Sequence, residues 1–151
     1  MKTGVLVLRY SETSAPESGT VGAHEEIVKS HGYVWLGKWG KAIPAARLTQ
    51  LAAEIDSGGQ AKLILAKRTP WRLVLHECLV TAVCEQLSPD ELLRVPQYYR
   101  GKTRSIGVWF RVISFRKMDK DEASRLVLLS NGRPLLAAIG HSKCSTFWVD
   151  A

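Results

Sequence analysis

The chain has 151 residues, of which 46% are hydrophobic and 23% are charged. This size and composition are typical of one globular domain that buries a core without help from disulfides or a metal. No apolar stretch approaches transmembrane length, and the apolar run Gly4–Leu8 is too short for the core of a signal peptide. We therefore expect a single domain over residues 1–151, located in the cytoplasm and without membrane contact.

The cysteines indicate a reducing compartment and no bound cofactor. There are three, and Cys78 and Cys84 lie in apolar, strand-like stretches, as buried thiols do. A structural zinc site needs two closely spaced ligand pairs. His141 and Cys144 have the spacing of one pair, and the second pair is missing. The sequence predicts neither a metal site nor a cofactor.

The net charge of +7 is concentrated in one part of the chain. Residues 60–120 contain 12 Lys/Arg and 5 Asp/Glu, whereas the rest of the chain contains 9 of each. Within that part, the stretch Arg94–Lys117 contains seven cations and no acidic residue. Such a basic face attracts polyanions, although a solvated basic loop and strand is the alternative interpretation. Aromatic residues interleaved with these charges favour nucleic acid, DNA or RNA, as the partner.

In chain order, the hydrophobic pattern predicts short strands alternating with short helices. We expect strands at Gly4–Arg9, Tyr33–Gly37, Lys62–Ala66, Trp71–Val83, Ser105–Phe115, Leu126–Leu129 and Thr146–Val149. We expect helices at His24–His31, Pro44–Asp56 and Leu135–Ile139, with a further short helix that a capping box opens at Ser88–Glu91. The long strand Trp71–Val83 is apolar on both faces, which is typical of a barrel or a covered sheet. The predicted fold class is α+β, a small barrel of about six strands with flanking short helices.

The run Gly32–Lys41 combines two tryptophans, a tyrosine and two lysines with three glycines. Strand alternation places Tyr33 and Trp35 on one face, and Trp39 joins them if the strand continues. Tryptophan rings stack on nucleobases, and glycines let a flat ring approach the backbone. The alternative is that Trp35 belongs to the core and Trp39 covers the barrel end.

Placed after the helix that begins at His24, the segment Gly32-Tyr33-Val34-Trp35-Leu36-Gly37-Lys38 resembles the EVE-like branch of the PUA-like superfamily. The later Ser130-x-Gly132-x-Pro134-Leu135 and the terminal Ser145–Val149 are also similar. The resemblance implies a small PUA-like barrel that recognises modified bases in DNA or RNA. In place of the family's Ser-Glu-Pro sequence after the first strand, this chain has Tyr10–Thr13, so a base-flipping pocket cannot be transferred to those residues.

Two further segments combine cations with aromatic residues. Tyr98–Arg104 contains two tyrosines, three cations and a glycine, a combination that suits a single-stranded or flipped nucleotide in a flexible loop. Lys67–Arg72 is expected to form a basic turn that holds phosphates or simply connects two strands.

Sequence signatures of catalysis are absent. There is no Gly-x-Ser-x-Gly, P-loop or His-Glu-x-x-His sequence. Glu77, alone among leucines, is either a carboxylate paired with an arginine or a contact for a ligand amine. Some relatives with an ASCH-type barrel are hydrolases, and Glu77, Lys67 and Lys102 are the residues that would serve such chemistry. We expect no catalytic residue.

These observations combine into one hypothesis, a nucleic-acid-binding module that inserts a base into an aromatic pocket rimmed by cations, with recognition of a modified base as its finer form. The stacking candidates are Trp35, Trp39 and Tyr99, and the candidates for bonding the base edge are Ser130 and Ser145. The candidate phosphate ligands are Lys38, Arg68, Arg100, Lys102, Arg104 and Arg116. The alternatives are a small-ligand or nucleotide sensor, a protein-interaction module with exposed tryptophan anchors, and a hydrolase acting on a modified nucleobase. The sequence leaves the oligomeric state open.

Overall fold

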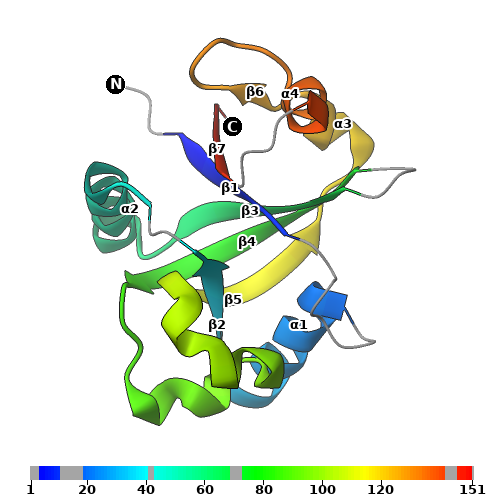
Figure 1. The fold of residues 1–151 in the computed structure, drawn as a ribbon. Coiled ribbons are helices and arrows are strands. Elements are labelled where there is room, and N and C mark those ends of the chain that lie inside the picture. Colours follow the sequence, from blue (N-terminus) through cyan, green and yellow to red (C-terminus); the bar gives the residue numbers. More distant parts are fainter. Residues whose placement is uncertain (1–3, 11–18, 41–42, 69–72, 142–145, 151) are drawn as a thin grey trace. The chain divides into compact units, whose positions relative to one another are not determined.

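A computed structural model describes residues 4–10, 19–40, 43–68, 73–141 and 146–150 of the chain (Figure 1). It consists of strands, α-helices and 3₁₀ helices, which confirms the predicted α+β class. The residues group into two compact units that interleave along the sequence. The first unit comprises Met1–Ser11, Lys62–Cys78 and Arg116–Ala151, and the second comprises Glu12–Ala61 and Leu79–Phe115. No helix in the described part is long and apolar enough to cross a membrane.

The first unit is organised around the buried strand β1 (Val5–Arg9). β1 pairs in parallel with β3 (Ala61–Arg68) and antiparallel with β7 (Thr146–Asp150), which in turn pairs with the two-residue β6 (Val127–Leu128). The apolar side chains of these strands pack with the short helix α4 (Leu135–His141). The first half of β4 (Leu73–Cys84) contributes Leu75 to the same core.

The first unit also contains α3 (Lys120–Ser124), which the sequence pattern did not predict. Its N-cap is Asp119, whose carboxylate accepts a hydrogen bond from the Glu122 backbone, and the Glu122 side chain accepts one from the Asp119 backbone. This reciprocal capping satisfies two backbone donors that a five-residue helix otherwise leaves open.

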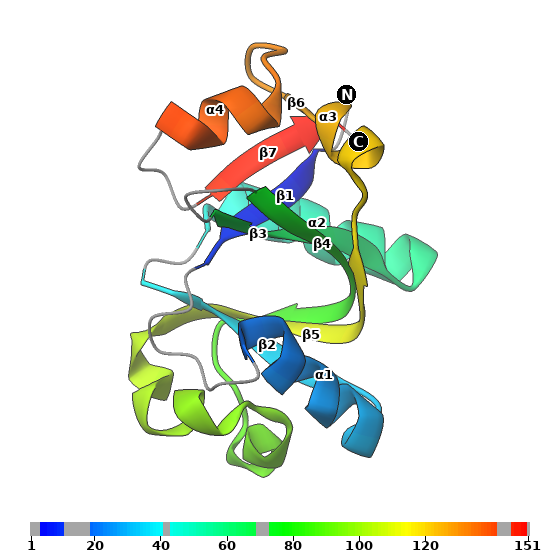
Figure 2. The ribbon, with the colours of Figure 1, turned by 90° about the vertical axis from the view of Figure 1, so that its right-hand side faces the viewer.

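The second unit contains α1 (Gly19–His31), β2 (Val34–Trp39), α2 (Ala45–Gly58) and most of β5 (Ile106–Lys117). β2 pairs antiparallel with β5, and α1 packs beside both strands (Figure 2). Close packing between the paired strands depends on Gly37, since a Cβ atom there would lie 2.8 Å from Ile106 Cγ2 and 3.0 Å from Trp109 Cζ3.

The helix α2 begins one residue after and ends two residues after the predicted bounds Pro44–Asp56. Pro44 occupies the N-cap position, and Gly59 ends the helix with a φ of 80° and an N–H bond to the Ile55 carbonyl. A left-handed residue at that position is nearly always glycine, because glycine has no Cβ to clash with the following carbonyl. By contrast, α1 begins at Gly19, five residues before the predicted start at His24.

The prediction of a barrel of about six strands is wrong, because the sheet is not closed. The strands form one seven-stranded mixed sheet in the order β2-β5-β4-β3-β1-β7-β6, with β2 at one end and β6 at the other. The edge strand β6 has only two residues. It therefore offers few backbone N–H and C=O groups to which a further strand could hydrogen-bond and close the sheet into a barrel. The prediction of one domain over the whole chain remains a prediction, because the two units are each defined by their own internal contacts.

Two predicted local features also differ. The segment around Tyr98–Arg104 is no open loop but a 3₁₀ helix, η2 (Gln97–Ser105), interrupted by non-helical dihedral angles at Lys102. Ser88 precedes a second 3₁₀ helix, η1 (Pro89–Arg94), but its side chain makes no capping hydrogen bond. The capping box fails because the Glu91 carboxylate accepts hydrogen bonds from two other side chains of the second unit, Tyr33 and Trp35.

Candidate nucleic-acid interface

Trp39, the last residue of β2, is the one exposed side chain among the tryptophans, tyrosines and phenylalanines that the structure describes. Its exposed fraction is 40%, whereas that of Trp35 is 6% and that of Tyr99 is 3%. The Trp39 ring meets the ring of Tyr99, on η2, edge-on at 82° with centroids 5.1 Å apart. The structure thus brings two of the three predicted stacking residues together, with one at the surface and one in the core.

The contact with Trp39 also bears on the ionisation of Tyr99. Burial raises the pKa of Tyr99 well above its ordinary value, Tyr98 adds to the rise, and a hydrogen bond with the Trp39 side chain acts in the opposite direction. The edge-on contact with the buried Tyr99 ring orients the Trp39 indole, and Trp39 remains 40% exposed.

Four predicted phosphate ligands lie in the second unit with Trp39. Lys38 immediately precedes it, is partly buried, and directs its ammonium toward the Trp39 carbonyl at 3.5 Å, and burial lowers the pKa of Lys38. Arg100, Lys102 and Arg104 are exposed on η2.

A backbone hydrogen bond joins the end of β2 to the end of η2. The N–H of Gly40 donates to the carbonyl of Ser105 at 2.8 Å. No ion pair joins Lys102 or Arg104 to a carboxylate among the described residues.

Two other arginines of the basic stretch are engaged inside the second unit. The guanidinium carbons of Arg94 and Arg111 lie 5.0 Å and 5.3 Å from the centre of the Tyr33 ring. Arg94 also approaches Glu91 at 3.7 Å, and Arg111 donates to the Thr81 hydroxyl at 2.8 Å. These cation–π and hydrogen-bonded contacts hold the two guanidinium groups against other side chains of the second unit. The uninterrupted basic stretch of the sequence therefore divides into internal and exposed cations.

Trp35 belongs to this internal cluster. Its indole nitrogen donates to the Glu91 carboxylate at 3.1 Å, and the Tyr33 hydroxyl donates to the same carboxylate at 2.8 Å. Partial burial acts to raise the pKa of Glu91, but the bonds from Tyr33 and Trp35 and the nearby arginines outweigh it, and the pKa is lowered. In this arrangement Trp35 presents no open face to a ligand.

The first unit contains two more of the predicted residues. Arg116 is bonded bidentately to Glu122, at 2.6 and 2.9 Å, and lies 3.4 Å from Glu77. Ser130 is exposed in the turn after β6. Ser145 and residues 69–72 of the predicted basic turn lie outside the described residues, and Arg68 is described only as the last residue of β3.

Glu77 is paired with cations of the first unit. Its carboxylate lies 3.4 Å from Arg116 and 3.9 Å from Lys62, and 21% of its side chain is exposed. The interpretation of Glu77 as the partner of an arginine is therefore confirmed.

The core beneath Tyr99 contains a fully buried histidine. His24 Nδ1 lies 2.6 Å from the Thr20 carbonyl, and its ring meets those of Tyr99 at 5.5 Å and Phe115 at 5.9 Å. Burial lowers the pKa of His24 to about 4, although the Thr20 bond opposes this. The imidazole is thus neutral at physiological pH, with Nδ1 carrying the proton that Thr20 accepts.

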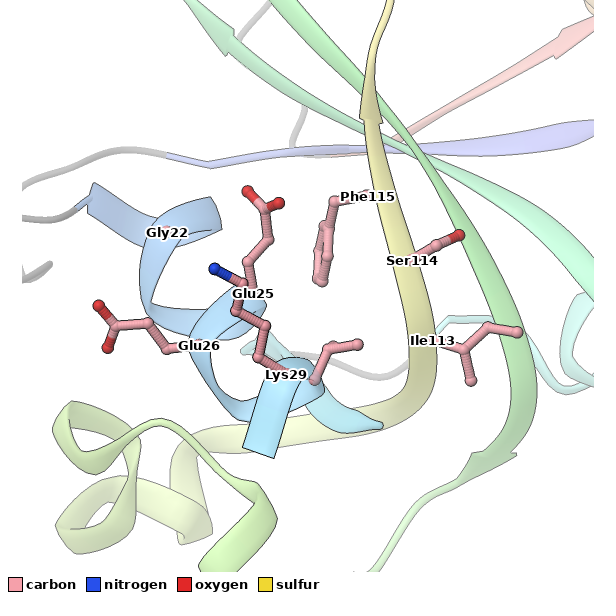
Figure 3. A pocket seen from close by; sticks show the side chains of 8 residues that line it. Gly22, Glu25, Glu26, Lys29, Ile113, Ser114 and Phe115 are labelled. Atoms are coloured by element: carbon pink, nitrogen blue, oxygen red, sulfur yellow. The ribbon is translucent and has the colours of Figure 1, made fainter. Parts of the chain in front are cut away.

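A pocket of about 470 Å³ opens elsewhere in the second unit, between α1 and β5 (Figure 3). Its α1 wall is one helix face, and its β5 wall includes the Phe115 ring; the lining residues are Gly22, Glu25, Glu26, Val28, Lys29, Ile113, Ser114 and Phe115. Glu25 and Phe115 project into the space between the two elements, whereas Glu26 points away from β5. The pocket is lined by two carboxylates, Glu25 and Glu26, and by one ammonium group, Lys29. The excess of negative charge disfavours the binding of a phosphate group in this pocket.

Sequence reasoning missed this pocket and the role of Glu91. The spacing of Gly22, Glu25, Glu26 and Lys29 along α1 does mark a single helix face. No pattern in the sequence, however, shows that Phe115 lies opposite that face. The Glu91 cluster is similarly long-range, since Tyr33 and Glu91 are 58 residues apart.

Comparison with known proteins identifies the family. No curated protein and no solved structure matches the chain significantly. A model of the Pua-like family matches residues 6–142, which is most of the chain and includes Trp39, Tyr99 and the η2 cations. The chain is therefore a member of the Pua-like family.

Proposed function

We propose that this protein binds nucleic acid through the surface formed by Trp39, Lys38 and the exposed cations of η2, here called the Trp39 face. The observation that carries the proposal is the position of an exposed indole at the end of β2, joined by Tyr99 and by the Gly40–Ser105 bond to a helix with three exposed cations. Phosphate contacts from Lys and Arg supply affinity, and a stacked base adds to it.

Membership of the family supports the same conclusion. Pua-like domains are generally associated with the binding of RNA and other nucleic acids. The match covers both β2 and η2, so the Trp39 face lies within the part of the chain that defines the family. The EVE-like resemblance is a finer hypothesis that the family match leaves open.

Recognition of a modified base is the finer form of this proposal. A stacked base keeps its edge accessible to neighbouring polar groups, and a substituent on that edge changes the fit. Comparing plain and modified cytosine in one oligonucleotide sequence tests this form. A difference of tenfold or more in affinity would support modified-base recognition, and equal affinities would confine the function to general nucleic-acid binding.

The nucleic-acid function is tested by titrating the protein with a labelled oligonucleotide at rising salt concentration. Each neutralised phosphate releases counterions, so log affinity falls linearly with log salt. With three to four cations engaged, the slope for a single strand is about −2 to −3. Affinity that does not change between low and physiological salt would rule out the proposal.

The pocket between α1 and β5 supports a second candidate, a sensor for a small molecule. Its aromatic wall and unequal charge suit an organic cation, because a cation is attracted both to a ring face and to a carboxylate. A nucleotide sensor at this pocket is disfavoured by the same carboxylates. Calorimetry with spermidine and with ATP distinguishes them: we expect spermidine to bind more tightly than ATP, and to lose affinity in Glu25→Gln.

A further inference from the structure

We infer that the Trp39 face accepts only unpaired nucleotides, in a single strand, a loop or an overhang, and does not extract a base from a duplex. This inference rests on the proposed nucleic-acid function and specifies its substrate class. It differs from the sequence-based hypothesis, in which several aromatic rings enclose an extruded base.

The first step is the number of rings available for stacking. Among the described residues, Trp35 and Tyr99 are 6% and 3% exposed, and Trp39 is 40% exposed. Tyr99 contacts Trp39 through an edge-on arrangement, so the two rings do not form parallel walls with a slot between them. Of these three described rings only that of Trp39 is exposed, so a base that stacks here contacts one ring on one side.

The second step compares the gain from stacking with the cost of extrusion. One stacked base is worth about 5- to 150-fold in affinity, equivalent to 1–3 kcal/mol. Breaking the pairing and stacking of a base within a duplex costs as much or more, and enzymes that flip bases offset it with an enclosing pocket and edge hydrogen bonds. The free energy gained by stacking on one exposed ring is therefore no larger than the free energy of extruding a base from a duplex. An unpaired base can stack on Trp39 without that extrusion.

The third step concerns the cations. Arg100, Lys102 and Arg104 lie within five consecutive residues of η2, and the four Cα–Cα steps between the first and the last extend over at most about 15 Å despite the kink at Lys102. These cations can contact neighbouring phosphates of one strand beside Trp39. Because backbone contacts and stacking carry no base-edge information, binding should tolerate different base sequences.

The test is fluorescence anisotropy with the full chain and three labelled probes of one sequence: a 12-nucleotide single strand, its blunt duplex, and that duplex with an unpaired overhang. We expect the single strand and the overhang probe to bind at least about tenfold more tightly than the blunt duplex. Trp39→Ala should lower affinity for the single strand by about 5- to 150-fold and alter affinity for the blunt duplex less than about twofold. Trp39→Phe, which keeps a ring face, should retain most of the single-strand affinity.

Two outcomes would overturn the inference while leaving nucleic-acid binding intact. In the first, the blunt duplex binds as tightly as the single strand and loses affinity in Trp39→Ala, which means that a base is extruded. In the second, Trp39→Ala binds every probe like the unaltered protein, with its salt dependence preserved, which means that cations alone hold the ligand. Failure of all three probes to bind at low salt would instead overturn the nucleic-acid function itself. A thermal melt of Trp39→Ala confirms that the variant is folded.

Discussion

The indole of Trp39 stands at 82° to the phenol ring of Tyr99, with centroids 5.1 Å apart, although 60 positions separate the two residues in the chain. Tyr99 is buried in a cluster with Trp35, Val95, Ile106 and Trp109, so the partner that holds Trp39 is itself fixed by the core. The exposed ring is thereby oriented before any ligand arrives. Orientation in advance reduces the conformational entropy lost on binding.

The first prediction separates the two tryptophans of β2 by their effects on stability. Trp39→Ala should leave the melting temperature nearly unchanged, because Trp39 is already 40% exposed to solvent, whereas Trp35 is 6% exposed. Trp35→Ala should lower the free energy of unfolding by about 3–5 kcal/mol, since it removes a buried ring. Denaturant unfolding of both variants measures this. If Trp39→Ala proves as destabilising as Trp35→Ala, Trp39 is a core residue and the Trp39 face is not a ligand surface.

The second prediction concerns the cations of η2. The double variant Lys102→Ala/Arg104→Ala should weaken oligonucleotide binding and make the slope of log affinity against log salt shallower by about 1.4, two phosphate contacts on a single strand. Lys120→Ala is the matched control, because Lys120 is exposed in the first unit on α3 and outside the Trp39 face. Equal slopes for the double variant and the control would remove η2 from the proposed interface.

The third prediction tests the packing that joins β2 to β5. Gly37→Ala should destabilise the protein by about 1–3 kcal/mol, because the added methyl group would overlap Ile106 and crowd Trp109. Gly58→Ala is the control, since nothing lies within 4 Å of a Cβ atom built there. Chemical denaturation compares the two variants. A neutral Gly37→Ala would mean that the strands separate easily at this point.

The fourth prediction is a loss of stability in mild acid caused by His24. Its pKa is lowered from 6.5 to about 4 in the folded protein, so between these values the unfolded chain binds a proton that the folded chain does not. The contribution to stability is complete above pH 6.5, declines by about 1.4 kcal/mol per pH unit as pH falls, and reaches a total loss of about 3 kcal/mol near pH 4.

Urea unfolding measured between pH 7 and pH 4 checks this, with His24→Asn as the comparison. Asparagine keeps a donor toward the Thr20 carbonyl but does not titrate, so the variant should show a flatter profile in that window. Identical pH profiles for the two proteins would contradict a buried, neutral His24.

The fifth prediction concerns Glu91. Glu91→Ala removes the shared acceptor of the Tyr33 hydroxyl and the Trp35 indole, and should destabilise the protein by about 1–3 kcal/mol. Glu91→Gln should be milder, because both bonds go to Oε2 and an amide oxygen at that position can still accept them. We expect the near-ultraviolet circular dichroism of the tryptophans to change in both variants. A fully stable Glu91→Ala would show that this cluster contributes nothing to the fold.

Local patterns in the sequence were sufficient for most of the secondary structure. Proline before Ala45 and the glycines after Ser57 mark the ends of α2, because proline and glycine restrict or free the backbone within one or two residues. The apolar runs of β1 and β5 likewise predict buried strands from short-range alternation. The α+β class follows from such signals. The Pua-like resemblance rests instead on short motifs such as Gly32–Lys38, and the family match confirms it.

The sequence by itself thus determined most of the segments that form strands and helices, where cations and aromatic residues concentrate, and which family the chain resembles. Only the tertiary structure decided which of those residues remain available to a ligand. Trp35 and Trp39 are four residues apart on one strand. Trp35 is buried and donates a hydrogen bond to Glu91, whereas Trp39 is exposed and contacts the Tyr99 ring edge-on. Likewise, the guanidinium groups of Arg94 and Arg111 pack on the Tyr33 ring, whereas the side chains of Lys102 and Arg104 are exposed. Burial and pairing depend on contacts between residues far apart in the chain, and strand or helix periodicity carries no information about those contacts.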